Sequence, residues 1–448
     1  MQKDLTKGSV LRVLLQFSLP YLLSCFLQTF YGMADLLITG QFNGAEAISA
    51  VSIGSQIMHM ITVIIVGIAM GSTVLISQFV GEKDLRKAGR AVGNSVTAFM
   101  VLSIVLTVLM LLSVNWLIGV ISVPAEAVGQ TKMYLIICFA GIPFITAYNI
   151  ISCIFRGMGD SKSPMYFIAI ACVLNIALDF VFIGGCGMGA AGAALGTVLS
   201  QTASVCIALL AVRKKSFGLR LEREDFIPDK KSMGNILKIG IPIAFQDGLI
   251  QISFMIITVI ANQRGVVTAA SVGIVEKVIS FFFLVPSAML SSISSITAQN
   301  VGARKYGRGA KTLRYGVMLS VTFGIIVAVL CQFQSELLLG MFTSEEEVIR
   351  MGVQYLRAYS LDCIVAAVHF CFSGYFCAYG YSGISFIQNV ISIVLLRVPG
   401  AYFASKMFPD TLYPMGLAAP AGSFLSAVIC VAVFVMLKKK FLPENIAD

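Results

Sequence analysis

Residues 20–35 read PYLLSCFLQTFYGMAD and lie inside the first long apolar segment of the chain. The stretch ends in Asp35, and the three residues that follow it are again apolar. A carboxylate at the centre of a membrane helix costs about 2.5–3.5 kcal/mol, so it needs a partner in protein or water. Tyr31 and Gln28 precede Asp35 by one and two helical turns, which places three polar groups on one face. We expect this face to point toward protein or water. A helix that simply ends near the membrane interface is the alternative.

The composition is that of a membrane protein. The chain has 448 residues, of which 58% are hydrophobic and 12% charged, and its mean hydropathy is +0.89. A soluble protein of this length would have about one-quarter charged residues. The first apolar segment, residues 11–38, is too long for the hydrophobic part of a cleaved signal peptide, so we expect it to remain as a membrane helix.

The eleven cysteines fall mostly within apolar runs, and no CxxC pattern occurs. His59 and His369 are the two histidines of the chain. This pattern indicates small thiols packed between helices and argues against a disulfide framework or a zinc site. We therefore expect no metal and no cofactor.

The fold class follows from the number of apolar segments. A helix that crosses the hydrocarbon needs about 20 apolar residues, which predicts an all-α protein with twelve transmembrane helices. The predicted spans are 11–38, 47–75, 91–114, 133–155, 164–184, 190–212, 236–261, 266–297, 314–338, 352–378, 384–404 and 414–437.

The basic residues predict the orientation of these spans. With the N-terminus inside, 25 of the 32 lysines and arginines fall on the cytoplasmic side and five on the other, which leaves Lys277 and Arg397 within the membrane. Cytoplasmic loops of membrane proteins carry this excess. The sequence therefore predicts a multi-pass protein of the cell (inner) membrane with both termini in the cytoplasm. The net charge of +10 then needs no nucleic-acid partner.

The two halves of the chain resemble each other. The stretch from Gln78 to Gly81 recurs as Gln299 to Gly302, and an offset of 221 also pairs Tyr134 with Tyr355. We predict an N-terminal lobe at 1–215, a cytoplasmic linker at 216–235 and a C-terminal lobe at 236–448. Because each lobe has an even number of spans, a pseudo-twofold axis along the membrane normal should relate them.

A second buried acid follows in the fifth span. Asn175 and Asp179 are four residues apart and share a helix face. At the repeat offset, Asp35 corresponds to Ile256 and Asp179 to Gly400, so the second half lacks both acids. A purely structural role would be needed in both halves. The restriction to one half therefore favours a functional site.

Paired carboxyls suit the binding of a coupling ion. Burial disfavours the charged form of a carboxyl group, and a second carboxyl nearby disfavours it again, so protons are held more strongly. A difference in protonation can bias a two-state arrangement of helices. Tyr31, Asn175 and Thr197 offer hydrogen bonds to either form. The same oxygens could hold sodium, so both ions remain open.

At these residues the chain resembles the multidrug and toxic compound extrusion (MATE) transporters, over essentially all twelve spans. The most specific matches are 20–35, 80–84, 156–162, 175–179 and 299–303. The acids in the N-terminal half are similar to those of the DinF-like branch. That resemblance implies a cation-coupling network of Asp35, Asp179 and Asn175, with Tyr31, Tyr134, Thr197 and Ser152 as supporting residues. It also implies a bend of the first helix at Pro20.

One departure concerns the sodium-coupled NorM-like branch. Ile250 stands where that branch has a glutamate, and Asp362 does not align cleanly with its aspartate. We interpret the remaining polar groups within the membrane as structural or interfacial, with the cavity wall as the alternative for two of them, Arg397 and His369. The others are Asp247, Glu276 and Lys277.

The sequence therefore predicts an antiporter and not an enzyme. It would export amphipathic or cationic organic compounds by alternating access, in exchange for protons, as a monomer in the lipid bilayer. Sodium-coupled drug efflux is one alternative. A flippase for lipid-linked saccharides from the same superfamily is another, although its cavity should contain more Arg and Lys. A passive channel fits the half-specific acids less well, and no motif of an intramembrane enzyme occurs.

Overall fold

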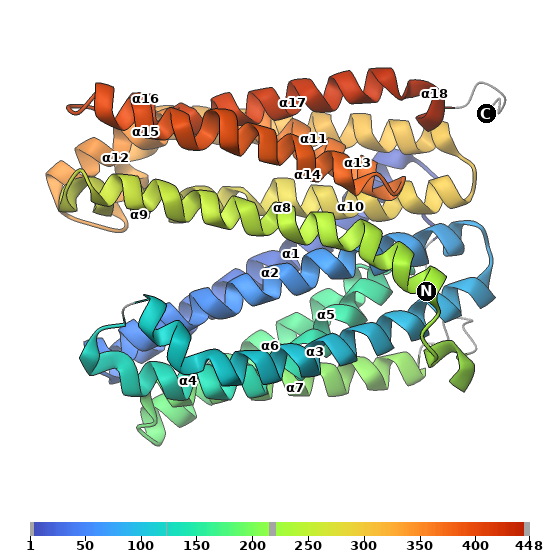
Figure 1. Ribbon diagram of the computed structural model, residues 1–448, viewed down its shortest axis with the longest axis horizontal. Coiled ribbons are helices and arrows are strands. Elements are labelled where there is room, and N and C mark those ends of the chain that lie inside the picture. The colour runs from blue at the N-terminus through green and yellow to red at the C-terminus, as the bar shows by residue number, and fades with distance from the viewer. Residues whose placement is uncertain (1–3, 122, 215–220, 443–448) are drawn as a thin grey trace. The chain divides into compact units, whose positions relative to one another are not determined.

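The chain is helical throughout the part that the structure describes. This structure is a computed structural model, and it describes residues 4–121, 123–214 and 221–442 (Figure 1). The helices of the first half are α1 (Val10–Phe42), α2 (Ala45–Gly81), α3 (Leu85–Ile121), η1 (Ala125–Ala127), α4 (Val128–Ala140), α5 (Ile142–Gly157), α6 (Lys162–Asp179), the π-helix η2 (Phe180–Gly185) and α7 (Gly189–Lys214).

The second half repeats this order of long and broken helices. Its elements are η3 (Arg223–Phe226), α8 (Lys230–Asn262), α9 (Val266–Phe282), α10 (Leu284–Gly302), α11 (Tyr306–Gly340), α12 (Glu346–Tyr359), α13 (Asp362–Ala378), α14 (Ser382–Ser392), the π-helix η4 (Ile393–Arg397), α15 (Val398–Met407), α16 (Tyr413–Gly416), α17 (Ala418–Met436) and α18 (Lys438–Phe441).

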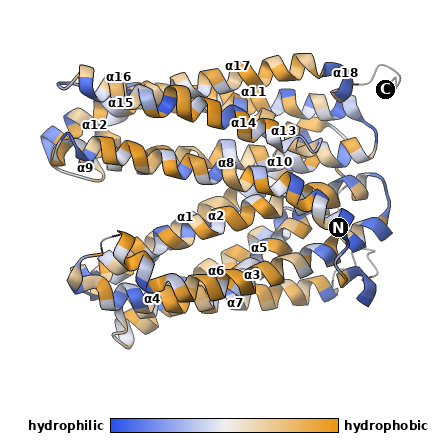
Figure 2. Cartoon of the chain, viewed as in Figure 1, coloured by the Kyte–Doolittle hydropathy of each residue, from blue (hydrophilic) through white to orange (hydrophobic). Residues whose placement is uncertain are grey.

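The expected number of membrane spans is confirmed. Within the described residues, ten helical segments are long and apolar enough to cross a membrane, and two bent pairs bring the number to twelve. Each predicted span falls on one of these segments. Hydrophobic residues cover the middle of the helices and hydrophilic residues gather at their ends (Figure 2). This is the distribution expected of an all-α membrane protein.

Two of the spans are bent, which hydropathy alone could not show. α4 and α5 meet at Gly141 with a bend of 48°. Pro143, in the first turn of α5, has no N–H to continue the hydrogen bonds of α4. In the second half, α12 and α13 meet with a bend of 41°. Both bends fall in the fourth span of their half.

The chain forms two compact units, and two of the three boundaries between them fall inside helices. The first unit is Leu19–Gly240 with Asp4, and the second is Leu5–Ser18 with Ile241 onward. The boundary in α1 lies just before Pro20, and the boundary in α8 lies just before Pro242. The lobes and linker expected from hydropathy stay a prediction, and residues 216–220 of that linker lie outside the described part.

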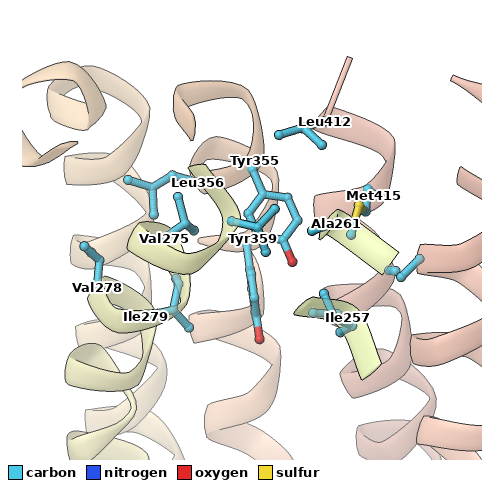
Figure 3. Packing of buried hydrophobic residues seen from close by; sticks show 14 of the residues in the cluster. Ile257, Ala261, Val275, Val278, Ile279, Tyr355, Leu356, Tyr359, Leu412 and Met415 are labelled. Atoms are coloured by element: carbon cyan, nitrogen blue, oxygen red, sulfur yellow. The ribbon is translucent and has the colours of Figure 1, made fainter. Parts of the chain in front are cut away.

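Each unit has its own apolar core. In the first, Tyr134, Phe139 and Ile142 pack with Ile183 and Ala194. In the second, one cluster joins α8, α9 and α12 around Tyr355 and Tyr359, which are fully buried (Figure 3). A second cluster of that unit contains the following residues from the start, middle and end of the chain: Leu5, Val13, Leu14, Phe17, Met289, Ile293, Phe376 and Phe441.

The chain segment that precedes α8 is bound to the first unit. The Asn94 amide Nδ2 donates to the Asp225 carbonyl over 3.1 Å, and its Oδ1 accepts from the Asp229 backbone N–H over 2.6 Å. Arg86 donates to the Asp225 carboxylate over 3.0 Å. These bonds fix the segment before the helix of the second half begins.

The segment that precedes α1 is bound in a similar way to the second unit. Lys305 Nζ donates to the Thr6 carbonyl over 3.0 Å, and Arg308 Nη1 donates to the Gly8 carbonyl over 2.8 Å. The Leu5 side chain is buried, with 1% of its surface exposed. The sequence QxVG occurs at 78–81 and at 299–302. The start of each half is therefore held by residues of the loop after one of these sequences, or of the following helix, α3 or α11.

Glycines bring α2 and α8 into backbone contact in the first unit. A Cβ atom added at Gly240 would lie 2.3 Å from the Ile68 carbonyl oxygen, and one at Gly71 would lie 2.1 Å from the Ile236 carbonyl oxygen. Neither backbone can move without displacing its helix. This contact therefore depends on the absence of a side chain at both positions.

We expect Gly240→Ala to lower the melting temperature of the purified protein, because the overlap costs about 1–3 kcal/mol as overpacking. Gly248→Ala is the control in the same helix, since a Cβ there meets nothing within 4 Å. That variant should melt at the wild-type temperature or slightly above it, because alanine favours helix. Equal melting temperatures for the two variants would contradict the packing described here.

Candidate functional site

Asp35 lies on α1 inside the first unit, with 4% of its surface exposed. The Thr197 hydroxyl on α7 donates to Asp35 Oδ2 over 3.2 Å. Asp35 Oδ1 is buried and has no hydrogen-bond partner among the described residues. One turn on, the Thr39 hydroxyl donates to the Asp35 backbone carbonyl over 2.7 Å, so it does not serve the carboxyl group. In the described chain, one oxygen of the carboxyl group thus accepts from Thr197 and the other has no donor.

The second acid is buried beside the first. Asp179 is the last residue of α6 and is fully buried, and its carboxyl group lies within electrostatic reach of Asp35. Asn175, one turn earlier, is 1% exposed. Within the described chain, neither oxygen of Asp179 accepts a hydrogen bond by geometry. Ionised carboxyl groups only accept hydrogen bonds, so a bond between these two acids requires a proton.

Two tyrosines and a glutamine surround the acids. Tyr31 lies one turn before Asp35 on α1, and its hydroxyl accepts a hydrogen bond from Gln201 Nε2 over 3.4 Å. Tyr134 on α4 is 2% exposed and lies within electrostatic reach of Asp35. The ring of Tyr134 packs where α2 has a glycine, since a Cβ at Gly54 would lie 2.2 Å from it. The polar group therefore draws on α1, α4, α6 and α7.

Gly196 is a part of this site that sequence reasoning missed. It lies on α7, and a Cβ atom there would lie 2.4 Å from Asp179 Oδ1 and 3.6 Å from Asn175 Nδ2. The absence of a side chain thus lets α7 approach the two polar residues of α6. Gly196 directly precedes Thr197, which the sequence already predicted as a supporting residue. A glycine next to a predicted site residue is the sequence signal that could have identified it.

The remaining residues of the expected network lie elsewhere in the same unit. Ser152 is buried on α5 beside Tyr148, and no contact in the described chain joins it to Asp35. Pro20 lies inside α1, where the Ser24 hydroxyl donates to its carbonyl over 2.9 Å. Tyr21, the next residue, stacks under the Arg156 guanidinium at 4.7 Å.

The second unit contains a different polar cluster. Arg397, at the end of η4, donates to the Tyr359 hydroxyl over 2.6 Å and lies 4.7 Å above the Phe254 ring. Asp362 is fully buried, and the carboxylate of Glu276 accepts from the Thr258 hydroxyl over 3.1 Å. Lys277 is exposed, and Asp247 on α8 is not among the groups within electrostatic reach of Arg397.

No described group of three or more His, Cys, Asp or Glu side chains is arranged to hold a metal ion. The chemistry of the first-unit site is thus that of two carboxyl groups, an amide and hydroxyls. Such groups can hold a proton or a small cation, but they contain no nucleophile–base pair for covalent catalysis.

Comparison with known families decides what kind of protein this is. The MatE family model matches residues 20–181 and again residues 242–403, which together cover most of the chain. The chain belongs to the MatE family. The two matched stretches have equal length and begin at Pro20 and Pro242, so the match also supports the internal repeat. MatE proteins are transporters and not enzymes, and this chain is accordingly a membrane-integral transporter.

Similar proteins carry multidrug names. The chain is 31% identical over 88% of its length to the probable multidrug resistance protein YpnP of Bacillus subtilis, with 88% of that protein covered. It is 23% identical to the multidrug export protein MepA of Staphylococcus aureus, with 89% of each chain covered. A solved outward-facing multidrug resistance MATE transporter has the same fold, with a TM-score of 0.91, 20% identity and 98% of each chain covered.

We expect Gly196→Ala to disturb the polar site of this MatE protein, because the new methyl group would overlap the Asp179 carboxyl group. Transport by cells that express the variant should fall several-fold. Gly119→Ala is the matched control, because a Cβ at Gly119 on α3 meets nothing within 4 Å. Unchanged transport by Gly196→Ala at equal expression would show that α7 does not need this close approach.

Proposed function

We propose that the protein is a proton-coupled antiporter that exports amphipathic or cationic organic compounds by alternating access. The observation that supports the proposal most directly is the burial of Asp35 and Asp179 within electrostatic reach of each other, with the Thr197 hydroxyl donating to Asp35. Multidrug names among the relatives support the class of substrate. A role in the DinF-like branch of the family belongs to the same proposal.

The shortage of donors favours a proton as the coupling ion. Two ionised carboxyl groups repel each other in a medium that screens charge poorly. A single proton removes the repulsion and supplies a donor, so the site changes both its charge and its hydrogen bonding when it is loaded. Asn175 supplies an amide beside the acids in either state, and its own side chain has no hydrogen-bond partner by geometry in the described chain.

The coupling cycle follows from these two states. In alternating access, a substrate-binding cavity opens to each side of the membrane in turn. When this substrate cavity faces outward, the site takes up a proton and the protein releases its drug. When the substrate cavity faces the cytoplasm, the proton leaves and the next drug molecule enters. We propose that Pro20 is where α1 bends between the two states, since proline removes one helical hydrogen bond. Tyr31, Tyr134 and Thr197 would orient the acids, with Ser152 more distant.

The remaining expectations from the sequence belong to this proposal. Both termini would lie in the cytoplasm of a monomer in the cell membrane. Sodium-coupled efflux uses the same oxygens and is the main alternative, which the experiment below separates. A flippase for lipid-linked saccharides has less support, because only Arg397 is buried among the intramembrane bases and Lys277 is exposed.

We expect Asp35→Asn to abolish most proton-driven transport. In everted vesicles with an acidic lumen, the wild-type protein should accumulate a cationic dye. Asp35→Asn should accumulate at least about tenfold less, because asparagine cannot take up the proton that drives transport. Asp410→Asn, which changes an exposed acid, should transport like the wild type.

A sodium gradient without a pH gradient forms the second arm of this experiment. It should leave the wild-type protein without dye accumulation. Accumulation driven by sodium and not by protons would overturn the choice of ion. Full proton-driven transport by folded Asp35→Asn would overturn the site itself.

A further inference from the structure

Arg397 and Phe254 of the second unit's polar cluster also line a small cavity of about 30 Å³. Its wall combines three aromatic rings with one arginine, one histidine and several small polar residues, contributed by α8, the junction between α9 and α10, α13, α14, η4 and α17. The residues that matter for the argument are Phe254, Phe283, Phe370, His369, Asn389 and Arg397. A volume of this size holds about one water molecule or one charged group, and not a whole drug molecule.

Arg397 is the charged residue of the cavity wall, and its charge is incompletely paired. Only 8% of its surface is exposed. One end of the guanidinium donates to the neutral hydroxyl of Tyr359 and its face lies on Phe254, while Nε has no partner in the described chain. Neither contact supplies a negative charge. His369, also in the wall, is 4% exposed, and its Nδ1 lacks a hydrogen-bond partner as well.

Two acids lie within electrostatic reach of Arg397. Asp362, in the first turn of α13, is fully buried, and neither of its oxygens accepts a hydrogen bond by geometry within the described residues. Glu276 on α9 is held by Thr258. Neither acid makes an ion pair with Arg397 within 4.0 Å in the described chain. An anion that entered the cavity would thus compete with these acids for the arginine.

The cavity occupies a place related by the repeat to the proposed proton site. The two family matches are offset by 222 residues, one more than the sequence identities above. At this offset Asp35 corresponds to Ile257 and Asp179 to Ala401. Phe254 and Arg397 lie about one helical turn before these positions, on the same helix faces. Where the first unit brings together two acids, the second unit brings together an aromatic ring and a cation.

We propose that this cavity is a binding site for one small monovalent anion, either a halide or a single carboxylate group, with Arg397 as its ligand and Asp362 as its internal competitor. Guanidinium groups bind carboxylates through paired N–H donors, and the free Nε is one of the donors required. The carboxylate of a transported compound and a free anion share this chemistry. The site does not depend on proton-coupled efflux.

The test measures the melting temperature of the purified full-length protein in detergent. Sodium chloride and sodium formate are titrated against sodium gluconate at constant ionic strength, because gluconate is too large for the cavity. Chloride, formate or both should stabilise the wild-type protein in a saturable way, as binding to the folded state requires. The anion with the lower half-saturating concentration identifies a halide or a carboxylate site.

Two variants should change this response in opposite directions. Arg397→Gln should lose the saturable stabilisation. Asp362→Asn, which removes the competing charge and keeps the shape, should reach half-saturation at an anion concentration about tenfold lower. If Arg397→Gln does not fold, Ser426→Leu fills the cavity without changing any charge and should lose the response instead.

The following results would overturn the proposal: no saturable effect on the wild type, an unchanged response in Arg397→Gln, or no gain in Asp362→Asn. Asp35→Asn separates this inference from the proposed function, since it should keep the anion response even where it cannot transport drug. A loss of the response in that variant would place the anion effect outside the cavity and count against the proposal.

Discussion

Neighbouring carboxyl groups repel when both are ionised. In the first unit Asp35 and Asp179 are buried within electrostatic reach of each other, where water screens this repulsion poorly. α7 contacts both acids. α7 provides the Thr197 hydroxyl to one acid, and its Gly196 leaves room for the other. An additional donor from the protein would relieve the repulsion permanently. The described chain leaves three of the four carboxyl oxygens without one, which is what the proposed ion-coupling role requires.

The two halves of the repeat contain polar clusters of different composition. Both have a bent fourth span, and in both a π-helical segment follows or ends at a charged residue, Asp179 in the first half and Arg397 in the second. π-Helical turns occur often at functional sites, because the extra residue shifts the side chains of one face. Each half thus has a charged residue next to a π-helical segment, an acid in the first half and a base in the second.

Hydropathy and helical spacing predicted much of this structure. Twelve apolar segments become twelve candidate spans, and the spacing of Asn175 and Asp179 predicts the face that α6 presents. The bend at Gly141 was missed, because a bent span and a straight span have the same hydropathy. Gly196 and Gln201 were missed for another reason: their roles depend on which helices pack together, and a repeat offset does not contain that information.

The start of α1 belongs to the second unit, whereas the rest of α1 belongs to the first. This division has a consequence for biosynthesis. Residues 5–18 are synthesised well before their partners, because Leu14 and Phe17 share a core with Phe376 and with Phe441. At about 5–20 residues per second, roughly 20–90 s of translation separate these partners. During that interval the first helix is inserted but its opening turns lack their final neighbours. The lipid, or the insertion machinery, must cover them until the last helix arrives.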